Sequence, residues 1–264
     1  MEKPSLVVVG TGIRVIGQMT TESIAWIKIA ENVLYVVYDP AAADIISNLN
    51  GSAESLAHFY AEGKPRRKSL EEMVDRVMAS VRSGKQTCLV LFGHPGVFSW
   101  VGHEAVRQAR DAGYTARMLP GISAADCLFA DLGLDPGTTG CQSYEAMDFL
   151  KNGRHADPSS LLLLWQIGVM GDPLYKSTGY DLSPLPLLVE RLCQTYGPDH
   201  TVFVYAAPID WGGEPMVERI PLGRLADARL LARSTLCIPP GKATRPDVEV
   251  CRRLKLPTAE SKDS

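Results

Sequence analysis

The sequence predicts an α/β protein made of two lobes, each with its own strands and helices. In the first half, continuous apolar runs alternate with amphipathic helices, a pattern typical of parallel strands buried on both faces. The second half has a different texture, with four strand-like runs and one clear helix. The 264 residues, 45% of them apolar, suffice for two coupled lobes that share a buried interface.

The strands are predicted by short apolar runs that end in glycine, proline or polar residues. The first run closes on Gly10-Thr11-Gly12, as a buried strand does when it enters a tight loop. A helix separates it from the second run, which implies a right-handed crossover. In chain order we expect strands over residues 5–9, 33–38, 88–91, 115–119, 160–166, 201–205, 216–220 and 234–238.

The helices are predicted by apolar stripes and by capping residues. The clearest begins at Ser69, where Glu72 is the expected capping-box partner, and ends at Gly84. Ser123 and Asp126 repeat the capping-box pattern beside a Pro-Gly turn, which predicts free amide donors at that helix N-terminus. Further helices are expected over residues 21–32, 102–111 and 187–196.

We place the boundary between the lobes at residues 119–121. This gives a first lobe over residues 1–119 and a second over residues 120–246. From residue 247 to residue 264 the chain turns polar, and we expect a frayed tail there.

The composition argues against several classes of protein. Net charge is −3, from 27 basic and 30 acidic residues, so no overall field attracts a nucleic-acid backbone. Six scattered cysteines predict buried free thiols in a reducing compartment. No signal peptide is visible, and no apolar run reaches the about 18 residues that span a bilayer. We expect a cytoplasmic protein that binds neither nucleic acid nor membrane and holds no metal.

A loop of sequence FGHPGVF, residues 92–98, directly follows a predicted strand. Such a loop lies at the carboxyl edge of a sheet, where open α/β folds bind small molecules. The earlier Gly10-x-Gly12 lacks the third glycine of a dinucleotide fingerprint, because position 15 is Val15. We interpret it as a sharp turn, and Asp39-Pro40 as loop structure rather than a ribose-binding acid.

Three motifs in order, GTG at residues 10–12, GHPG at 93–96 and LPGISA at 119–124, resemble those of the tetrapyrrole-methylase-type S-adenosylmethionine-dependent methyltransferases. The resemblance covers nearly the whole chain. It implies two α/β lobes of that type, with the cofactor in the cleft between them. His94 stands where most of that superfamily has an acidic residue.

Longer matches resemble the borosin peptide backbone N-methyltransferases. They lie at residues 10–13, 16–20, 93–98, 116–124, 126–132, 144–150, 166–168, 205–207 and 234–235. The resemblance implies methylation of backbone amides in a ribosomally made precursor peptide. A tetrapyrrole or other small-molecule methyltransferase, such as a diphthamide-modifying one, stays open, as does a non-catalytic peptide-binding protein of the same fold.

The partner is also implied by the resemblance. Fused members of the borosin family methylate their own C-terminal extension, whereas the polar tail here lacks an apolar core peptide. We therefore expect the split type, which acts on a separate precursor with a small recognition domain. The resemblance further implies a homodimer, or a heterotetramer with two precursors.

Backbone amide methylation needs two catalytic groups. A base must accept the amide proton, and a cation or donor must hold the charge that moves onto the carbonyl oxygen. By resemblance, Tyr60 is the proton acceptor and Arg66, or Arg67, binds the oxygen, with the arginine also favouring the tyrosine's phenolate. Family members can have tyrosine at three positions that here hold Ala57, Leu70 and Phe92.

The resemblance also implies the residues that hold S-adenosylmethionine and its product, S-adenosylhomocysteine. One wall would come from the loop after the third strand, donors from a helix N-terminus, and the rest from the second lobe. His94 has the alternative role of shaping its loop. In that order the expected residues are Phe92, His94, Val97, Phe98, Ser123, Ala124, Gln166, Tyr205, Ser234 and Thr235.

Overall fold

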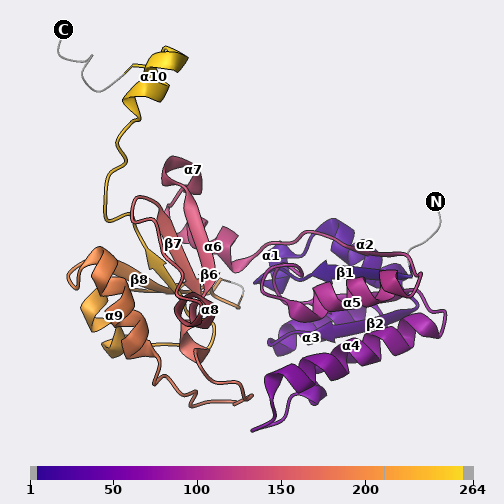
Figure 1. Ribbon diagram of the computed structural model, residues 1–264. Helices are drawn as coiled ribbons and strands as arrows, with labels where there is room; N and C mark the ends of the chain where they lie inside the picture. The colour runs from indigo at the N-terminus through magenta and orange to yellow at the C-terminus, as the bar shows by residue number, and fades with distance from the viewer. Residues whose placement is uncertain (1–4, 211, 258–264) are drawn as a thin grey trace.

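The computed structural model describes residues 5–210 and 212–257, and it confirms an α/β fold in two lobes (Figure 1). A five-stranded sheet forms the centre of each lobe. None of the helices in these ranges is long and apolar enough to cross a membrane.

The sheet of the first lobe is entirely parallel, in the order β3-β2-β4-β1-β5. Its strands are β1 (Leu6–Gly10), β2 (Asn32–Val36), β3 (Glu54–Ser55), β4 (Thr87–Leu91) and β5 (Ala116–Met118). The three central strands are buried along their whole length, which explains their unbroken apolar runs. All carboxyl ends therefore lie at one edge of the sheet.

Helices cover both faces of this sheet. One buried cluster joins α4 (Arg66–Arg82) and α5 (Trp100–Asp111) to one face. Another joins α2 (Thr21–Ile29) and α3 (Pro40–Leu49) to the other. The short helices α1 (Val15–Gln18) and η1 (Ala57–Phe59) follow β1 and β3.

The second lobe has a mixed sheet in the order β6-β7-β10-β8-β9, in which only β6 and β7 pair in parallel. The strands are β6 (Cys141–Glu145), β7 (Leu161–Trp165), β8 (Thr201–Ala206), β9 (Met216–Pro221) and β10 (Thr235–Ile238). The helices are α6 (Ala124–Leu132), α7 (Pro136–Thr139), α8 (Ala146–Lys151), η2 (Ile167–Val169), α9 (Leu185–Tyr196) and η3 (Leu222–Asp227). Ile13 and Phe92 of the first lobe join the apolar cluster beneath this sheet, which couples the lobes.

The expected start of α4 is wrong. The helix begins at Arg66, and Pro65, with φ −55° and ψ 122°, is its N-cap just outside the helix. Ser69 does not cap it: its hydroxyl donates to the Phe59 carbonyl at 2.9 Å. Glu72 instead forms an ion pair with Lys64. Arg66 and Arg67 therefore stand on the first turn of a helix rather than in a loop.

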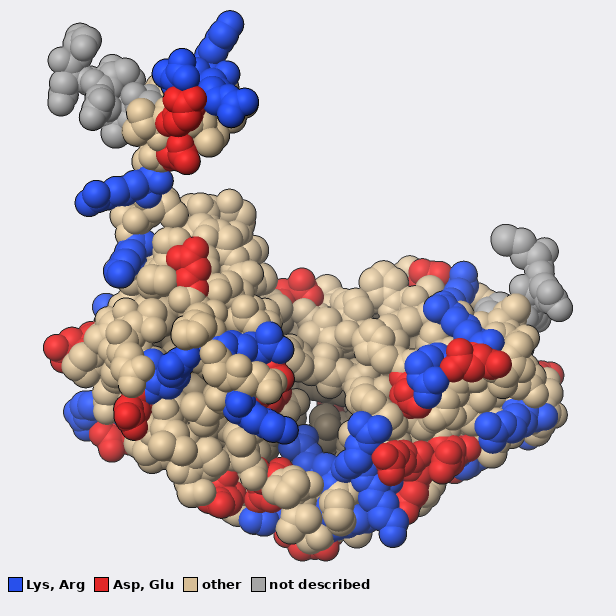
Figure 2. All heavy atoms as spheres, in the orientation of Figure 1, with Lys and Arg blue, Asp and Glu red and all other residues tan. Residues whose placement is uncertain are grey.

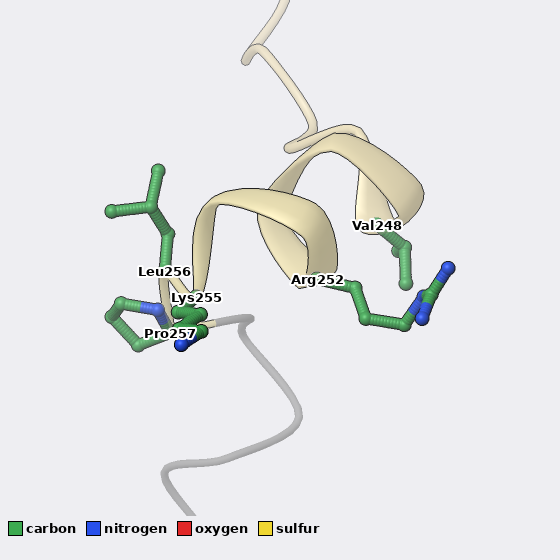
Figure 3. Close-up of a pocket in the computed structure, with 5 residues that line it drawn as sticks. All are labelled: Val248, Arg252, Lys255, Leu256 and Pro257. Atoms are coloured by element: carbon green, nitrogen blue, oxygen red, sulfur yellow. The ribbon is translucent and has the colours of Figure 1, made fainter.

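Two smaller expectations are also corrected. The tail begins with a helix, α10 (Val248–Leu254), whose first turn is capped by Asp247, while residues 258–264 lie outside the described ranges. This helix stands away from both lobes (Figure 1), and the described residues that line the hollow beside it in Figure 3 all belong to the same segment. The six cysteines are free, but only Cys88 and Cys237 are buried, and Cys141 is exposed on the edge strand β6.

Candidate active site

The loop after β4 is held against the loop after β1. Backbone bonds join Gly93 N to the Gly12 carbonyl at 3.0 Å and Thr11 N to the Leu91 carbonyl at 2.9 Å. A Cβ atom on Gly10 would lie 2.1 Å from the Gly93 oxygen, so only glycine fits there. The Gly10-x-Gly12 pattern therefore serves a close approach of two chains, which confirms the sharp turn.

His94 shapes the loop that carries it. Its Nδ1 accepts a hydrogen bond from the Gly96 amide at 2.9 Å. The imidazole is half-buried and turned back onto its own loop. The loop-shaping alternative thus has direct support, whereas a contact between His94 and a cofactor stays a prediction.

Two residues with strained backbone lie at one contact between the lobes. Phe98 has φ 51° and Gln166, which follows β7, has φ 62°, values that non-glycine residues rarely adopt. The ring of Phe98 packs on that of Trp165 with centroids 5.4 Å apart. Both Val97 and Phe98 nevertheless remain exposed. Such strain collects at ligand sites, because the surrounding fold holds a side chain where a ligand needs it.

The N-terminus of α6 points to the same region, but its cap is already used. Ser123 and Asp126 form the expected capping box, in which the Ser123 amide and hydroxyl both donate to the Asp126 carboxylate, at 2.6 and 2.7 Å. Ser123 therefore offers no free donor, contrary to our expectation. Among the described residues, the Ala124 amide has no hydrogen-bond acceptor and is available to a ligand.

Three of the expected residues in the second lobe have polar groups that are buried, and two of these groups are already hydrogen-bonded within the protein. The Tyr205 hydroxyl donates to Asp131 at 2.7 Å, and Ser234 Oγ accepts from the Leu231 amide at 2.9 Å. Thr235, like these two, is buried. The structure thus places them within the protein wall, and their contact with a cofactor stays a prediction.

The remaining groups fit a cofactor that has an aromatic ring and polar ends. Val97 and Phe98 form an exposed apolar wall, Ala124 supplies a free amide, and Gln166 contributes a side-chain amide at the end of β7. These groups come from both lobes. Val97 and Phe98 belong to the loop that follows β4, at the carboxyl edge of the parallel sheet, the position at which open α/β folds bind ligands.

A second contact between the lobes holds Tyr60. The segment before α9 runs antiparallel to the segment before α4 (Figure 1): Gly63 N donates to the Tyr175 carbonyl at 2.9 Å, and Tyr175 N to the Lys64 carbonyl at 2.8 Å. The Tyr60 and Tyr175 rings are stacked, with centroids 4.8 Å apart and planes 20° apart. Tyr60 therefore belongs to the first lobe but is fixed by the second.

The two candidate arginines point to different neighbours. Arg67 donates to Glu71 at 2.7 Å and stacks over Trp100 at 3.9 Å from the ring centre. Arg66 acts on the tyrosines instead, because its charge lowers the pKa values of Tyr60 and Tyr38. Among the described residues, Arg66 forms no ion pair.

Arg66 favours the phenolate form of Tyr60, as expected, but other effects on the pKa of Tyr60 outweigh it. Burial raises the pKa of the Tyr60 hydroxyl above its usual value, the charge of Tyr38 raises it further, and Arg66 lowers it by less. Water solvates a phenolate better than the partly closed junction does. Tyr60 is therefore a neutral phenol near pH 7 in the free protein.

Tyr38 is the residue at this site that sequence reasoning missed. It follows β2, and its ring meets that of Phe92 edge-on at 5.4 Å. The two tyrosines influence each other: Tyr60 lowers the pKa of Tyr38, and Tyr38 raises the pKa of Tyr60. The available signal was its place directly after a buried parallel strand, on the edge that carries the other site residues.

Of the three positions without a family tyrosine, two belong to apolar packing. Leu70 packs on the core of the first lobe, and Phe92 on the cluster that couples the lobes. Ala57 is exposed at the start of η1.

Figure 2 shows the surface hollowed between the lobes, with Lys and Arg side chains at the rim of the hollow.

Comparisons with known proteins identify the family and the fold of the chain. A family model described as Tetrapyrrole (Corrin/Porphyrin) Methylases matches residues 5–223. A uroporphyrin-III-C-methyltransferase from Thermus thermophilus has a similar structure, with a TM-score of 0.63, 18% identity and coverage of 97% of this chain and 98% of that one. That likeness shows the fold.

Relatives with higher sequence identity come from fungi. The chain is 41% identical over 264 residues to a methyltransferase/ribosomally synthesized cyclic peptide dendrothelin A precursor of Dendrothele bispora, covering 98% of this chain and 63% of that protein. It is 41% identical over 267 residues to a methyltransferase/ribosomally synthesized type I borosin cyclic peptide precursor of Coprinopsis marcescibilis, covering 98% and 68%. The chain thus spans less than two thirds of the dendrothelin A relative.

Proposed function

Because this chain belongs to the tetrapyrrole methylase family and, within it, to the borosin methyltransferases, we propose that it methylates backbone amide nitrogens of a peptide. The methyl donor is S-adenosylmethionine, whose sulfonium supplies an electrophilic methyl group. The observation that carries the proposal is that Tyr60 and Arg66 both lie at the junction of the lobes: Tyr60 stacks on Tyr175, and the Arg66 amide donates to the Pro173 carbonyl at 2.9 Å. The charge of Arg66 also lowers the pKa of Tyr60.

The cofactor site is assigned to groups from both lobes. Val97 and Phe98 offer an apolar surface to an adenine ring, and the Ala124 amide and the Gln166 side chain offer polar contacts. The strained backbone at Phe98 and Gln166 holds these side chains before a ligand arrives.

Tyr60 and Arg66 answer the two needs of amide methylation. Arg66 has no ion-pair partner among the described residues, so its guanidinium is free to bind the peptide carbonyl oxygen as negative charge moves onto it. Tyr60 would act in its phenolate form, of which its raised pKa leaves little near pH 7, and would accept the amide proton as the N–H bond breaks. S-adenosylmethionine, when bound, would supply the methyl group to the nitrogen as its carbon–sulfur bond breaks, leaving S-adenosylhomocysteine. Arg67 is assigned a structural role, because Glu71 and Trp100 already hold it.

The proposal also concerns whether the methylated peptide is part of this chain or a separate one. The relatives are each named as both a methyltransferase and a cyclic peptide precursor, and this chain covers 63% of one and 68% of the other. We propose that the peptide is a separate chain, with a recognition domain, that enters the hollow between the lobes. A dimer that encloses this peptide accords with the resemblance to borosin enzymes.

The test is a transfer assay with isotope-labelled S-adenosylmethionine. The full chain is incubated alone, with the product of a short reading frame encoded beside it, and with a tetrapyrrole acceptor. Label on backbone nitrogens of the added peptide, located by fragmentation in a mass spectrometer, is the expected result. Label only on the tetrapyrrole, or cofactor binding without any transfer, contradicts the proposal. Label on the chain's own backbone would leave the activity standing and overturn the separate precursor.

A further inference from the structure

One segment of the second lobe pairs with the part of the first lobe that carries the two proposed catalytic residues. This bridging segment, residues 172–177, lies between η2 and α9. Its backbone runs along residues 62–66: the Tyr175 amide donates to the Lys64 carbonyl at 2.8 Å, and the Gly63 amide donates to the Tyr175 carbonyl at 2.9 Å. The two lobes are therefore joined beside the proposed catalytic side chains.

The bridging segment contacts both of these catalytic residues. The Arg66 amide donates to the Pro173 carbonyl at 2.9 Å. The Tyr60 ring stacks on that of Tyr175, with centroids 4.8 Å apart. A shift of the bridging segment would therefore move the proposed proton acceptor and the proposed oxygen-binding group together, and a misplacement of about 1 Å can cost a reaction about 10²-fold in rate.

Apolar packing does not set the shape of the bridging segment. Among the described residues, the apolar clusters of the two lobes include none of residues 172–177. Asp172 is buried, whereas the rest of the segment is half-buried or exposed. The segment also lies outside the helices and strands of the described chain, apart from an isolated bridge between Pro65 and Leu174. Polar contacts must therefore set its shape.

The carboxylate of Asp172 makes such contacts. It accepts from the Leu174 amide at 3.1 Å and from the Asp181 amide at 3.3 Å. It also forms an ion pair with Lys176 at 2.6 Å, and only 4% of its side chain is exposed. A buried carboxylate is stable only where donors replace water, and these three donors all follow Asp172 closely in the sequence. The buried charge thus fixes the course of the bridging segment around itself.

We propose that Asp172 is a positioning residue, which fixes the bridging segment in the shape that holds Tyr60 and Arg66 for methyl transfer. The proposal rests on the proposed function of this site. Asp172 acts through the Tyr175 ring and the Pro173 carbonyl, and it does not itself contact the peptide or the methyl donor.

The first test is Asp172→Asn, which keeps the size of the side chain but removes its charge and one acceptor oxygen. We expect the single-turnover rate, on the acceptor that the wild-type chain methylates, to fall by about tenfold. Cofactor affinity, measured by calorimetry, should stay within about twofold of the wild type, because Phe98 and Gln166 lie outside the bridging segment. An unchanged rate would overturn the proposal.

The matched control is Asp157→Asn. The Asp157 carboxylate also shapes a local turn of the second lobe, accepting from the Ser159 amide at 2.9 Å and from the Ser159 hydroxyl at 2.7 Å. This turn precedes β7, whereas the bridging segment follows that strand. The control should keep the wild-type rate within about twofold. An equal loss of rate in both variants would show a general loosening of the second lobe and contradict the proposal.

Hydrogen exchange in Asp172→Asn reports on the positioning without any turnover. The Gly63, Arg66 and Tyr175 amides should exchange about tenfold faster than in the wild type, because the pairing that protects them opens more often. The Gly93 amide, which is bonded at the other contact between the lobes, should keep its wild-type exchange rate.

The exchange measurement also separates this inference from the proposed function. If Asp172→Asn lowers only the midpoint of unfolding and leaves exchange at residues 62–66 unchanged, Asp172 serves stability alone and the proposal is overturned. If the wild type transfers no methyl to any peptide, the proposed function fails, while faster exchange in the variant still shows that Asp172 holds the bridging segment against the first lobe.

Discussion

The two lobes use their polar side chains in opposite ways. In the second lobe the expected site hydroxyls are occupied: Tyr205 binds Asp131, and Ser234 binds the Leu231 amide. In the first lobe, Tyr60 and Arg66 lie at the carboxyl edge of a parallel sheet and serve no structural ion pair among the described residues. In the proposed mechanism the first lobe would therefore supply the catalytic side chains, while the second lobe packs against them and holds Tyr60 through its stack on Tyr175.

The largest effect is expected from the first lobe at Tyr60. Tyr60→Phe should slow methyl transfer by about 10²- to 10⁴-fold, because the proton acceptor is lost while the stacking on Tyr175 remains. Single-turnover kinetics with a saturating methyl donor measure this, and calorimetry should show unchanged cofactor binding. Turnover at the wild-type rate would remove Tyr60 from the mechanism.

Arg66 and Arg67, neighbours in the first turn of α4, allow a catalytic side chain to be compared with a structural one. Arg66→Ala should lower kcat by about 10²-fold, the scale of losing one group that stabilises developing charge. Arg67→Ala is the matched control and should change kcat by less than about threefold, because it loses only exposed contacts to Glu71 and Trp100. The opposite order of effects would reverse their assignment.

A smaller effect, on the stability of the fold, is expected where the backbones of the loops after β1 and β4 pack together beneath the site. Gly10→Ala forces a Cβ into the Gly93 carbonyl, so we expect the free energy of unfolding to fall by about 1–3 kcal/mol. Gly51→Ala is the control, because a Cβ there meets no atom within 4 Å. Denaturant unfolding of both variants measures the difference, and equal midpoints would argue against the close approach of the two loops.

The smallest effect is expected in the second lobe. Tyr205→Phe removes one hydrogen bond to Asp131, which should lower the free energy of unfolding by about 1 kcal/mol. Cofactor affinity and the rate of transfer should stay within about threefold of the wild type, because the hydroxyl faces Asp131. A tenfold loss of cofactor affinity would instead support the direct cofactor contact expected from the sequence.

Most of the fold was predictable, because its signals are local. A few consecutive residues suffice to recognise the apolar runs of β1, β2 and β4 and the capping box at Ser123. Strand β6 was missed because its sequence, CQSYE, is largely polar, as an edge strand permits. The Ser69 capping box was wrong because the helix begins one turn earlier, at Arg66.

The site was only partly predictable, because it depends on contacts between distant segments. The sequence identifies Tyr60 and leaves two arginines open, and only the neighbours of each guanidinium distinguish them. Tyr175 stacks on Tyr60 from the other lobe, and no local pattern marks such a partner. The raised pKa of Tyr60 likewise arises from burial at the junction, which a sequence does not display.

The most direct test of the central claim, that the Tyr60 group accepts the amide proton, is the pH dependence of the single-turnover rate of methyl transfer to a peptide. We expect the wild-type rate to rise by about tenfold per pH unit across the neutral range, because the raised pKa values of Tyr60 and Tyr38 leave little phenolate there. In Tyr60→Phe the residual rate should lose this slope. A wild-type rate independent of pH, or a slope that survives in Tyr60→Phe, would contradict the account.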